Sequence, residues 1–288
     1  MNDKRKVLKE RDRPESLVPL QGTKGVAVDP DTGYTYKYVS EIDIERKKKF
    51  ARIGSNRKQN KFTNTNMDEI DYICQSLTNT QIGLLMILQC YIDYDGKLVH
   101  SQKDKTPLKT SDFLKILGLV GKESTFKKFR KDCLEKGILI YKGEEKTYSI
   151  NQKYVFKGAF KGMEVVSMVT KEIKEISKVL KPTDLAILFK LQKYVHINSM
   201  ALVRNPDETN IDKIETLKAI DLVEILGVSQ NYIYSRLPKL TYNGQALIAQ
   251  VKAGRKKSYM LNPNAFFRGD FAKVQEKIAH PNGVFFNA

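Results

Sequence analysis

An internal repeat constrains the fold of this chain more than any other feature of its sequence. Residues 110–118 (TSDFLKILG) match residues 219–227 (AIDLVEILG), with Asp, Ile, Leu and Gly at the same four places. Further along, YSIN at 148–151 matches YMLN at 259–262. Each copy covers about 90 residues, which is a normal size for one compact core. The repeat therefore predicts two domains with the same fold.

The matched segment of the second copy has the pattern of a helix-turn-helix. Apolar residues recur at helical spacing through a first helix at 217–226. They are Leu217, Ile220, Val223 and Leu226. Gly227 is typical of a helix C-terminus, and a serine at 229 can accept a hydrogen bond from the amides that begin the next helix. The tripeptide Gly-Val-Ser is therefore expected to connect two helices tightly, and Gly118 gives the first copy the same elbow.

The next segment indicates a second helix followed by a β-hairpin. Ile233, Leu237 and Leu240 are expected to point inward, which leaves a polar outer face. Two β-rich runs, at 247–251 and 258–261, flank the segment KAGRKK, so the hairpin tip carries four positive charges. A plain three-helix core or a solvated loop would explain each part alone. The elbow, the uncharged hydrogen-bonding face and the basic hairpin in this order favour a winged helix-turn-helix that binds DNA.

Both copies supply candidate DNA-binding residues. In the second copy they are Ser229, Gln230, Asn231, Tyr234, Ser235, Arg236 and Lys239 in the recognition helix, with Lys252, Arg255, Lys256 and Lys257 in the wing. In the first copy they are Lys122, Ser124, Thr125, Lys127, Lys128 and Lys131. These side chains can hold phosphates or read the edges of bases.

The two copies differ in the chemistry of these surfaces. The recognition helix of the first copy is predicted at 122–135, with Phe129 and Leu134 inward and an outer face that is more cationic than that of the second copy. Its wing tip, KGEEK at 142–146, has no net charge. The first copy is therefore expected to supply mainly phosphate contacts, and the second copy to supply more sequence readout together with a basic wing.

The charge balance points to an anionic partner. Fifty Lys and Arg against 33 Asp and Glu leave a net charge of +17, for which nucleic acid is the first candidate. The longest apolar run, at 82–92, is interrupted by Gln89 and is too short to span a bilayer. The N-terminal segment has no apolar core typical of a secretion signal. A cytoplasmic, nucleoid-associated protein without membrane contact is expected.

The sequence shows no recognisable catalytic or metal-binding motif. The histidines His100, His196 and His280 are isolated, and GLVGKES at 118–124 is too short for a phosphate-binding loop. The cysteines lack zinc spacing and are expected to be buried thiols. They are Cys74, Cys90 and Cys133. We therefore predict a protein that is not an enzyme and that holds no cofactor and no metal.

These observations predict a mainly α, α+β chain with small β-hairpins and two tandem winged helix-turn-helix domains. The expected divisions are an N-terminal arm with a hairpin at 25–39 and a basic segment (1–66), the two domains (67–162 and 163–272) and a C-terminal tail (273–288). The first domain should begin with helices at 67–77 and 80–93. The second should begin with helices at 163–180 and 184–195, the former carrying the apolar stripe Val165, Val169, Ile173, Ile176 and Leu180.

Two short motifs resemble the RepL family of plasmid replication proteins from Firmicutes. One is Val28-Asp-Pro-Asp-Thr-Gly33, and the other is Met260-Leu-Asn-Pro263 followed by Arg268-Gly-Asp270. The chain departs from that family in having two winged units, which instead resembles plasmid initiators that bind repeated origin sequences. Either resemblance implies origin binding by a plasmid or phage replication initiator that recruits host replication proteins.

Other functions stay open at this point. A winged-helix transcription regulator of a mobile element would have the same residues, with host transcription proteins as partners, and a structural or RNA-binding adaptor is a third interpretation. Direct repeats beside an A·T-rich tract near the gene would favour an initiator. An inverted repeat that overlaps a promoter would favour a regulator. A homodimer is also compatible with the apolar stripe at 163–180.

Overall fold

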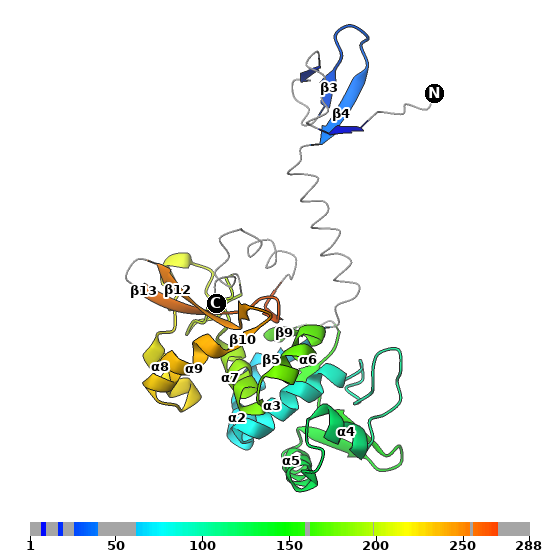
Figure 1. Ribbon diagram of the computed structural model, residues 1–288, viewed down its shortest axis with the longest axis vertical. Coiled ribbons are helices and arrows are strands. Elements are labelled where there is room, and N and C mark those ends of the chain that lie inside the picture. Colours follow the sequence, from blue (N-terminus) through cyan, green and yellow to red (C-terminus); the bar gives the residue numbers. More distant parts are fainter. Residues whose placement is uncertain are drawn as a thin grey trace. The chain divides into compact units, whose positions relative to one another are not determined.

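The computed structural model describes residues 7–9, 17–19, 26–39, 62–158, 162–197, 199–253 and 256–269. The chain divides into two compact units, residues 1–59 and 60–288 (Figure 1). The described residues form an α+β fold with eight α-helices and several small, mostly antiparallel sheets. None of these helices has the length and apolar character needed to cross a membrane.

The first unit contains a sheet with the strand order β1-β4-β3-β2. Its strands are β1 (Val7–Lys9), β2 (Val18–Pro19), β3 (Val26–Val28) and β4 (Thr35–Val39). The predicted hairpin at 25–39 is confirmed, because β3 pairs antiparallel with β4. In its turn the amide of Asp31 donates to Asp29 Oδ1 at 3.0 Å, and Gly33 has a φ of 68° that suits glycine. The predicted basic segment at 46–58 lies outside the described residues.

In the second unit one series of elements occurs twice: a strand, two helices, a 3₁₀ turn, two further helices, a hairpin and a short strand. The first series is β5 (Phe62–Asn66), η2 (Met67–Glu69), α2 (Ile70–Ser76), α3 (Asn79–Leu88), η3 (Gln89–Tyr91), α4 (Thr110–Ile116), α5 (Glu123–Glu135), β6 (Leu139–Lys142), β7 (Thr147–Ile150) and β8 (Val155–Phe156). The second series is β9 (Val165–Val169), α6 (Thr170–Val179), α7 (Pro182–Leu191), η4 (Gln192–Tyr194), η5 (Ile211–Lys213), α8 (Ala219–Leu226), α9 (Gln230–Arg236), η6 (Leu237–Lys239), β10 (Thr241–Tyr242), β11 (Gln245–Ala246), β12 (Ile248–Ala253), β13 (Lys256–Leu261) and β14 (Phe266–Phe267).

A four-stranded sheet joins the two series, and no motif in the sequence predicted it. Its order is β14-β9-β5-β8, so each series contributes two strands. At its centre β5 and β9 run antiparallel, with Asn64 opposite Ser167. The Ser167 hydroxyl donates to Asn64 Oδ1 at 2.8 Å. The sequence Phe-Thr-Asn-Thr-Asn at 62–66, which lies at the end of the predicted N-terminal arm, forms a buried strand.

The predicted helix at 163–180 is wrong in its first half. Residues 165–169, Val-Val-Ser-Met-Val, form strand β9, and every one of them is buried. Branched β-carbons lose side-chain freedom in a helix and pack well on a sheet, so this valine-rich run favours a strand. The helix α6 begins at Thr170, and its Ile173 and Ile176 are buried as the apolar stripe predicts.

Helices α3 and α7 pack together at the centre of the second unit (Figure 1). The predicted core positions Ile82, Leu85 and Leu88 of α3 have no exposed surface. At Gly83 the two helices approach so closely that a β-carbon would overlap the backbone carbonyl of Pro182. The close packing of the two series therefore requires a residue without a side chain at this position.

Replacement of Gly83 by alanine should destabilise the second unit even though alanine favours a helix by about 1 kcal/mol. The added methyl group must displace the first turn of α7, and overpacking of this kind costs on the order of 1–3 kcal/mol. Urea denaturation followed by circular dichroism measures the change. Gly143→Ala is the control, because nothing lies within 4 Å of a β-carbon there. A stabilised Gly83→Ala variant would contradict the packing.

Candidate nucleic-acid interface

A tight turn in the second series holds α8 and α9 in a fixed relation. Gly227 ends α8 in the left-handed region at φ 65°, and its amide donates to Val223 O at 2.9 Å. The Ser229 hydroxyl accepts from the Tyr232 amide at 3.2 Å and so caps α9. The three-residue connection predicted at 227–229 is therefore confirmed.

The apolar stripe predicted for α8 needs a correction. Ile220 is 60% exposed, whereas Leu217, Leu222 and Leu226 are buried. The helix begins at Ala219, so Leu217 lies before it and is not part of its apolar face. Positions 222 and 226 are four residues apart and share one face of the helix, and Ile220 projects from another face.

The first series has the same elbow with a longer turn. Gly118 follows α4 with a φ of 64°, but six residues, 117–122, separate α4 from α5. The GLVGKES segment lies in this turn and at the start of α5. Val120 is exposed in the turn.

The outer face of α9 is polar and contains no acidic residue. Ile233 and Leu237 are buried beneath it, as predicted, together with Leu240 just after it. The exposed side chains are Ser229, Gln230, Asn231, Tyr234, Ser235 and Lys239. Gln230 Nε2 donates to the hydroxyl of Tyr234 at 3.2 Å, which links two neighbouring turns of this face.

Arg236 has a role that the sequence did not indicate. Its Nε donates to Asp184 Oδ1 at 2.9 Å, and its Nη2 pairs with Asp184 Oδ2. This hydrogen bonding raises the pKa of Arg236. Asp184 lies in the first turn of α7 and is only 2% exposed, so its carboxylate requires a charged partner. Arg236 therefore positions α9 on α7.

The first series makes the corresponding contact with other residues. Gln81 in the first turn of α3 donates from Nε2 to Asp132 Oδ2 on α5 at 2.6 Å. Gln81 is also part of the capping box of α3, because its Oε1 accepts from the Thr78 amide at 2.9 Å. Polar side-chain contacts thus hold α5 on α3 in the first series and α9 on α7 in the second.

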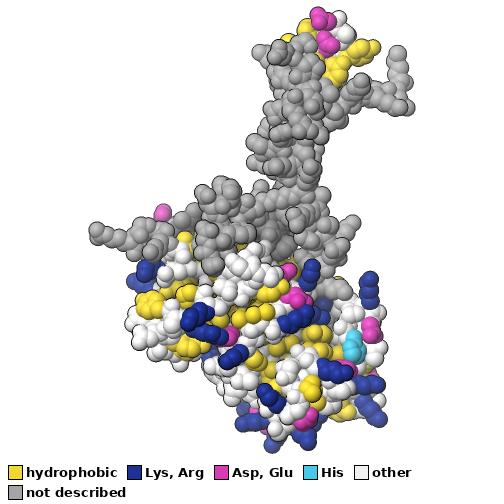
Figure 2. All heavy atoms as spheres, in the orientation of Figure 1, with side chains coloured by type: hydrophobic (Ala, Val, Ile, Leu, Met, Phe, Trp, Pro, Cys, Tyr) yellow, Lys and Arg dark blue, Asp and Glu magenta, His cyan; other side chains and the backbone are white. Residues whose placement is uncertain are grey.

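The outer face of α5 is cationic. Phe126, Phe129 and Cys133 are buried on its inner side, and Leu134, which was predicted to point inward, is half-buried. The candidate DNA-binding residues predicted in this segment are all exposed. They are Lys122, Ser124, Thr125, Lys127, Lys128 and Lys131. Lys131 lies 3.7 Å from Glu135, both on the surface. Figure 2 shows Lys and Arg side chains gathered at the bottom of the view, where Figure 1 places α5.

The two hairpins that follow these helices differ in charge. At the tip of β6–β7, Lys97 Nζ lies 2.8 Å from Glu145 Oε2, and this hydrogen bond lowers the pKa of Glu145. In β12–β13 the register sets Lys252 opposite Lys257. The Lys257 side chain is exposed. Gly254 and Arg255, and the side chains of Lys252 and Lys256, lie outside the described residues.

The described residues hold no cluster of three or more His, Cys, Asp or Glu that could bind a metal. His196 is buried, with Nδ1 2.9 Å from Ser199 Oγ and Nε2 2.7 Å from the Glu208 carbonyl, so both ring nitrogens have structural partners. Among the cysteines, Cys90 and Cys133 are buried as predicted, and Cys74 is only partly buried. Burial raises the pKa of Cys74 to about 11 and that of Cys90 to about 12. These thiols are therefore protonated at neutral pH.

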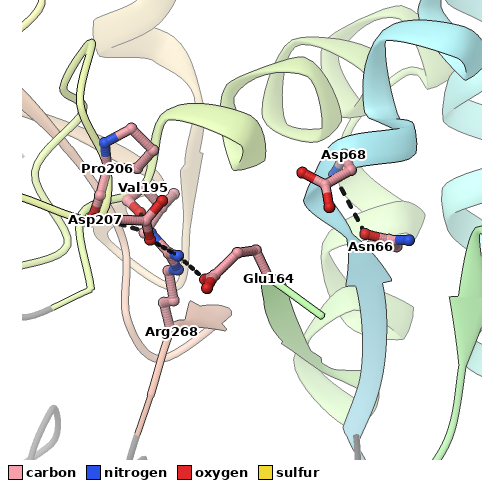
Figure 3. A network of polar contacts seen from close by, with 7 residues as sticks. All are labelled: Asn66, Asp68, Glu164, Val195, Pro206, Asp207 and Arg268. Atoms are coloured by element: carbon pink, nitrogen blue, oxygen red, sulfur yellow. Dashed lines mark hydrogen bonds and ion pairs between the residues drawn. The ribbon is translucent and has the colours of Figure 1, made fainter. Parts of the chain in front are cut away.

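Arg268, which belongs to one of the RepL-like motifs, anchors the loop before α8. It is 2% exposed, and its Nη1 donates to the carbonyls of Val195 (3.2 Å) and Pro206 (2.9 Å). Its Nη2 pairs with Glu164 and Asp207 (Figure 3). A buried guanidinium needs several acceptors of this kind.

Lys157 occupies the corresponding place in the first series, where its Nζ donates to the Ile92 carbonyl at 3.1 Å. In the same region Asn66 begins η2 by accepting from the Asp68 amide at 3.2 Å (Figure 3). The side-chain amide of Asn66 donates to the Lys153 carbonyl at 3.1 Å. These contacts fix the loops that surround the shared sheet.

No protein-family model matches this chain, and comparisons with curated proteins and with solved structures find no match either.

Replacement of Arg236 by glutamine should lower the free energy of unfolding by about 3 kcal/mol, because it leaves the buried Asp184 carboxylate without its charged partner. Lys239→Gln is the control, since a change at this exposed position should stay within about 0.5 kcal/mol. Urea denaturation measures both. The double variant Asp184→Asn with Arg236→Gln should recover part of the loss, and equal, small effects of Arg236→Gln and Lys239→Gln would refute the positioning role.

Proposed function

We propose that the two elbows, each with its following hairpin, are winged helix-turn-helix units that bind duplex DNA in a sequence-specific manner. In each unit α5 or α9 serves as the recognition helix, and β6–β7 or β12–β13 serves as the wing. The observation that carries the proposal is the exposed outer face of α9, which is polar and lacks acidic side chains, while Arg236 joins this helix to the buried Asp184 of α7. An α-helix of this kind fits the major groove.

The chemistry of the two faces supports different contributions to binding. Asn231 and Gln230 carry side-chain amides, which can make paired hydrogen bonds to adenine. The lysines of α5 are compact charges suited to phosphates, and the net charge of +17 agrees with a polyanionic partner. The first winged unit, which contains α5, therefore supplies mainly affinity. The second winged unit, which contains α9, supplies most of the readout.

The cellular role that we propose is a plasmid or phage replication initiator that binds origin repeats and recruits host replication proteins. The short RepL-like motifs and the paired units support this role. The alternative is a transcription regulator of a mobile element, which would use the same surfaces. Both roles place the protein in the cytoplasm with the nucleoid and leave catalysis to host enzymes.

One experiment tests the binding and separates the two roles. The purified full chain is incubated with the DNA that flanks its own gene, and protected positions are mapped by footprinting at modest ionic strength. Protection of direct repeats beside an A·T-rich tract supports the initiator, and protection of a promoter supports the regulator. A protein that binds no DNA sequence preferentially would refute the proposal.

Replacement of Lys127 and Lys128 by alanine should weaken binding to all DNA sequences alike. The plot of log K against log salt should become shallower by about one unit for each phosphate that is no longer neutralised. Lys171→Ala with Lys178→Ala on α6 is the control, because it removes the same charge from another exposed surface. Equal salt slopes for the two double variants would contradict the assignment of α5.

Asn231→Ala should relax the sequence preference and leave the salt slope unchanged. Removal of one paired hydrogen bond to a base reduces discrimination at that position by about 1–3 kcal/mol. Competition between the preferred duplex and single-base variants measures the effect. If Asn231→Ala weakened binding equally to preferred and unrelated duplexes, Asn231 would not read a base.

A further inference from the structure

The strand register relates the two series by a two-fold rotation. Neighbouring antiparallel strands are related by an axis perpendicular to their sheet. In β5 and β9 this axis passes between Asn64 and Ser167, because Phe62 lies opposite Val169 and Asn66 lies opposite Val165. The paired strands thus extend by two residues on either side of the pair formed by Asn64 and Ser167.

The outer strands obey the same rotation. Asn64 of β5 pairs with Phe156 of β8, and Ser167 of β9 pairs with Phe267 of β14. Asn64 and Ser167 are the two residues at the axis, so each outer strand ends level with it. The complete sheet therefore has the symmetry of a homodimer interface, although one chain forms it.

Contacts far from the sheet repeat in the same way. Asn151 donates its side-chain amide to the Gly137 carbonyl at 3.0 Å, and Asn262 donates to the Ala246 carbonyl at 2.8 Å. The basic side chains Lys157 and Arg268 also hold equivalent carbonyls, as described above. The rotation thus relates the corresponding elements of the two series, including those that flank the hairpins β6–β7 and β12–β13.

The recognition helices follow this rotation because each is fixed to its own central helix. Gln81 holds α5 through Asp132, and Asp184 holds α9 through Arg236, with both contacts in the first turn of the central helix. Figure 1 shows α4 and α5 on one side of the α3–α7 pair and α8 and α9 on the other. A rotation about an axis leaves the level along that axis unchanged. The two recognition helices therefore lie at the same level along the axis and run in opposite senses about it.

We infer that one chain binds a single DNA site made of two different half-sites in inverted orientation. This inference rests on the proposed function and specifies its ligand. Duplex DNA has two-fold axes perpendicular to its length, and symmetric pairs of recognition helices match inverted half-sites about one helical turn, roughly 10 base pairs, apart. The half-sites differ in sequence because the amide-bearing face of α9 and the lysine-rich face of α5 differ. Two winged units joined only by a flexible linker would not prefer inverted half-sites over direct ones.

The test uses the full chain and a site selected from random duplex DNA. Hydroxyl-radical footprinting locates the two protected segments, and the Asn231→Ala variant identifies the segment that the second winged unit reads. Dissociation constants are then compared for the selected site, for a site with one half-site reversed in place, and for each half-site alone. Reversal of an equal length of unprotected flanking DNA is the control.

Reversal of one half-site should weaken binding by about 100-fold, to the level of a single half-site, since the two winged units can no longer bind the site together. The flanking reversal should have no effect. Equal or tighter binding to the reversed site would overturn the inverted arrangement while leaving DNA binding intact. A selection that yields no preferred sequence would overturn the proposed function, and the inference with it.

Discussion

The pairing of β5 with β9 is the interaction on which the compact unit of residues 60–288 depends. It joins segments whose central residues, Asn64 and Ser167, are 103 positions apart in the sequence. Around it the two series bury their apolar helices against one another, and Gly83 allows α3 and α7 to approach closely. A single hydrophobic core runs through both copies of the repeat. Neither copy therefore has a core of its own that is separate from its neighbour.

Side-chain contacts attach the outer elements of both series to this shared core. Each elbow is connected to the centre by a side-chain contact from the first turn of α3 or α7, and the loop that precedes each elbow is held by a buried basic residue, Lys157 or Arg268. The equivalent positions hold different residues, Gln81 with Asp132 in one series and Asp184 with Arg236 in the other. The shape of the support is thus retained while the chemistry varies, which is what a site with two unlike halves requires.

The two copies differ in the turn between the outer helices, in the helix that follows this turn and in the hairpins. The first copy has a turn of six residues and a helix of 13 residues with exposed lysines, whereas the second has a three-residue turn and a helix of seven residues with amides and hydroxyls. These are the exposed segments, where substitutions have little effect on packing. The proposed division between phosphate contacts and base readout follows from this pattern.

Local structure could be read from the order of residues alone. Helical spacing, the glycines at 118 and 227 and the cap at Ser229 all depend on interactions within a few residues, so their patterns are visible directly. Three outcomes emerged only from the folded chain: Val165–Val169 is a strand, Phe62–Asn66 pairs with it, and Arg236 faces Asp184. Each of them depends on partners distant in the chain. The repeat shows that two copies exist, but only strand register fixes the rotation that relates them.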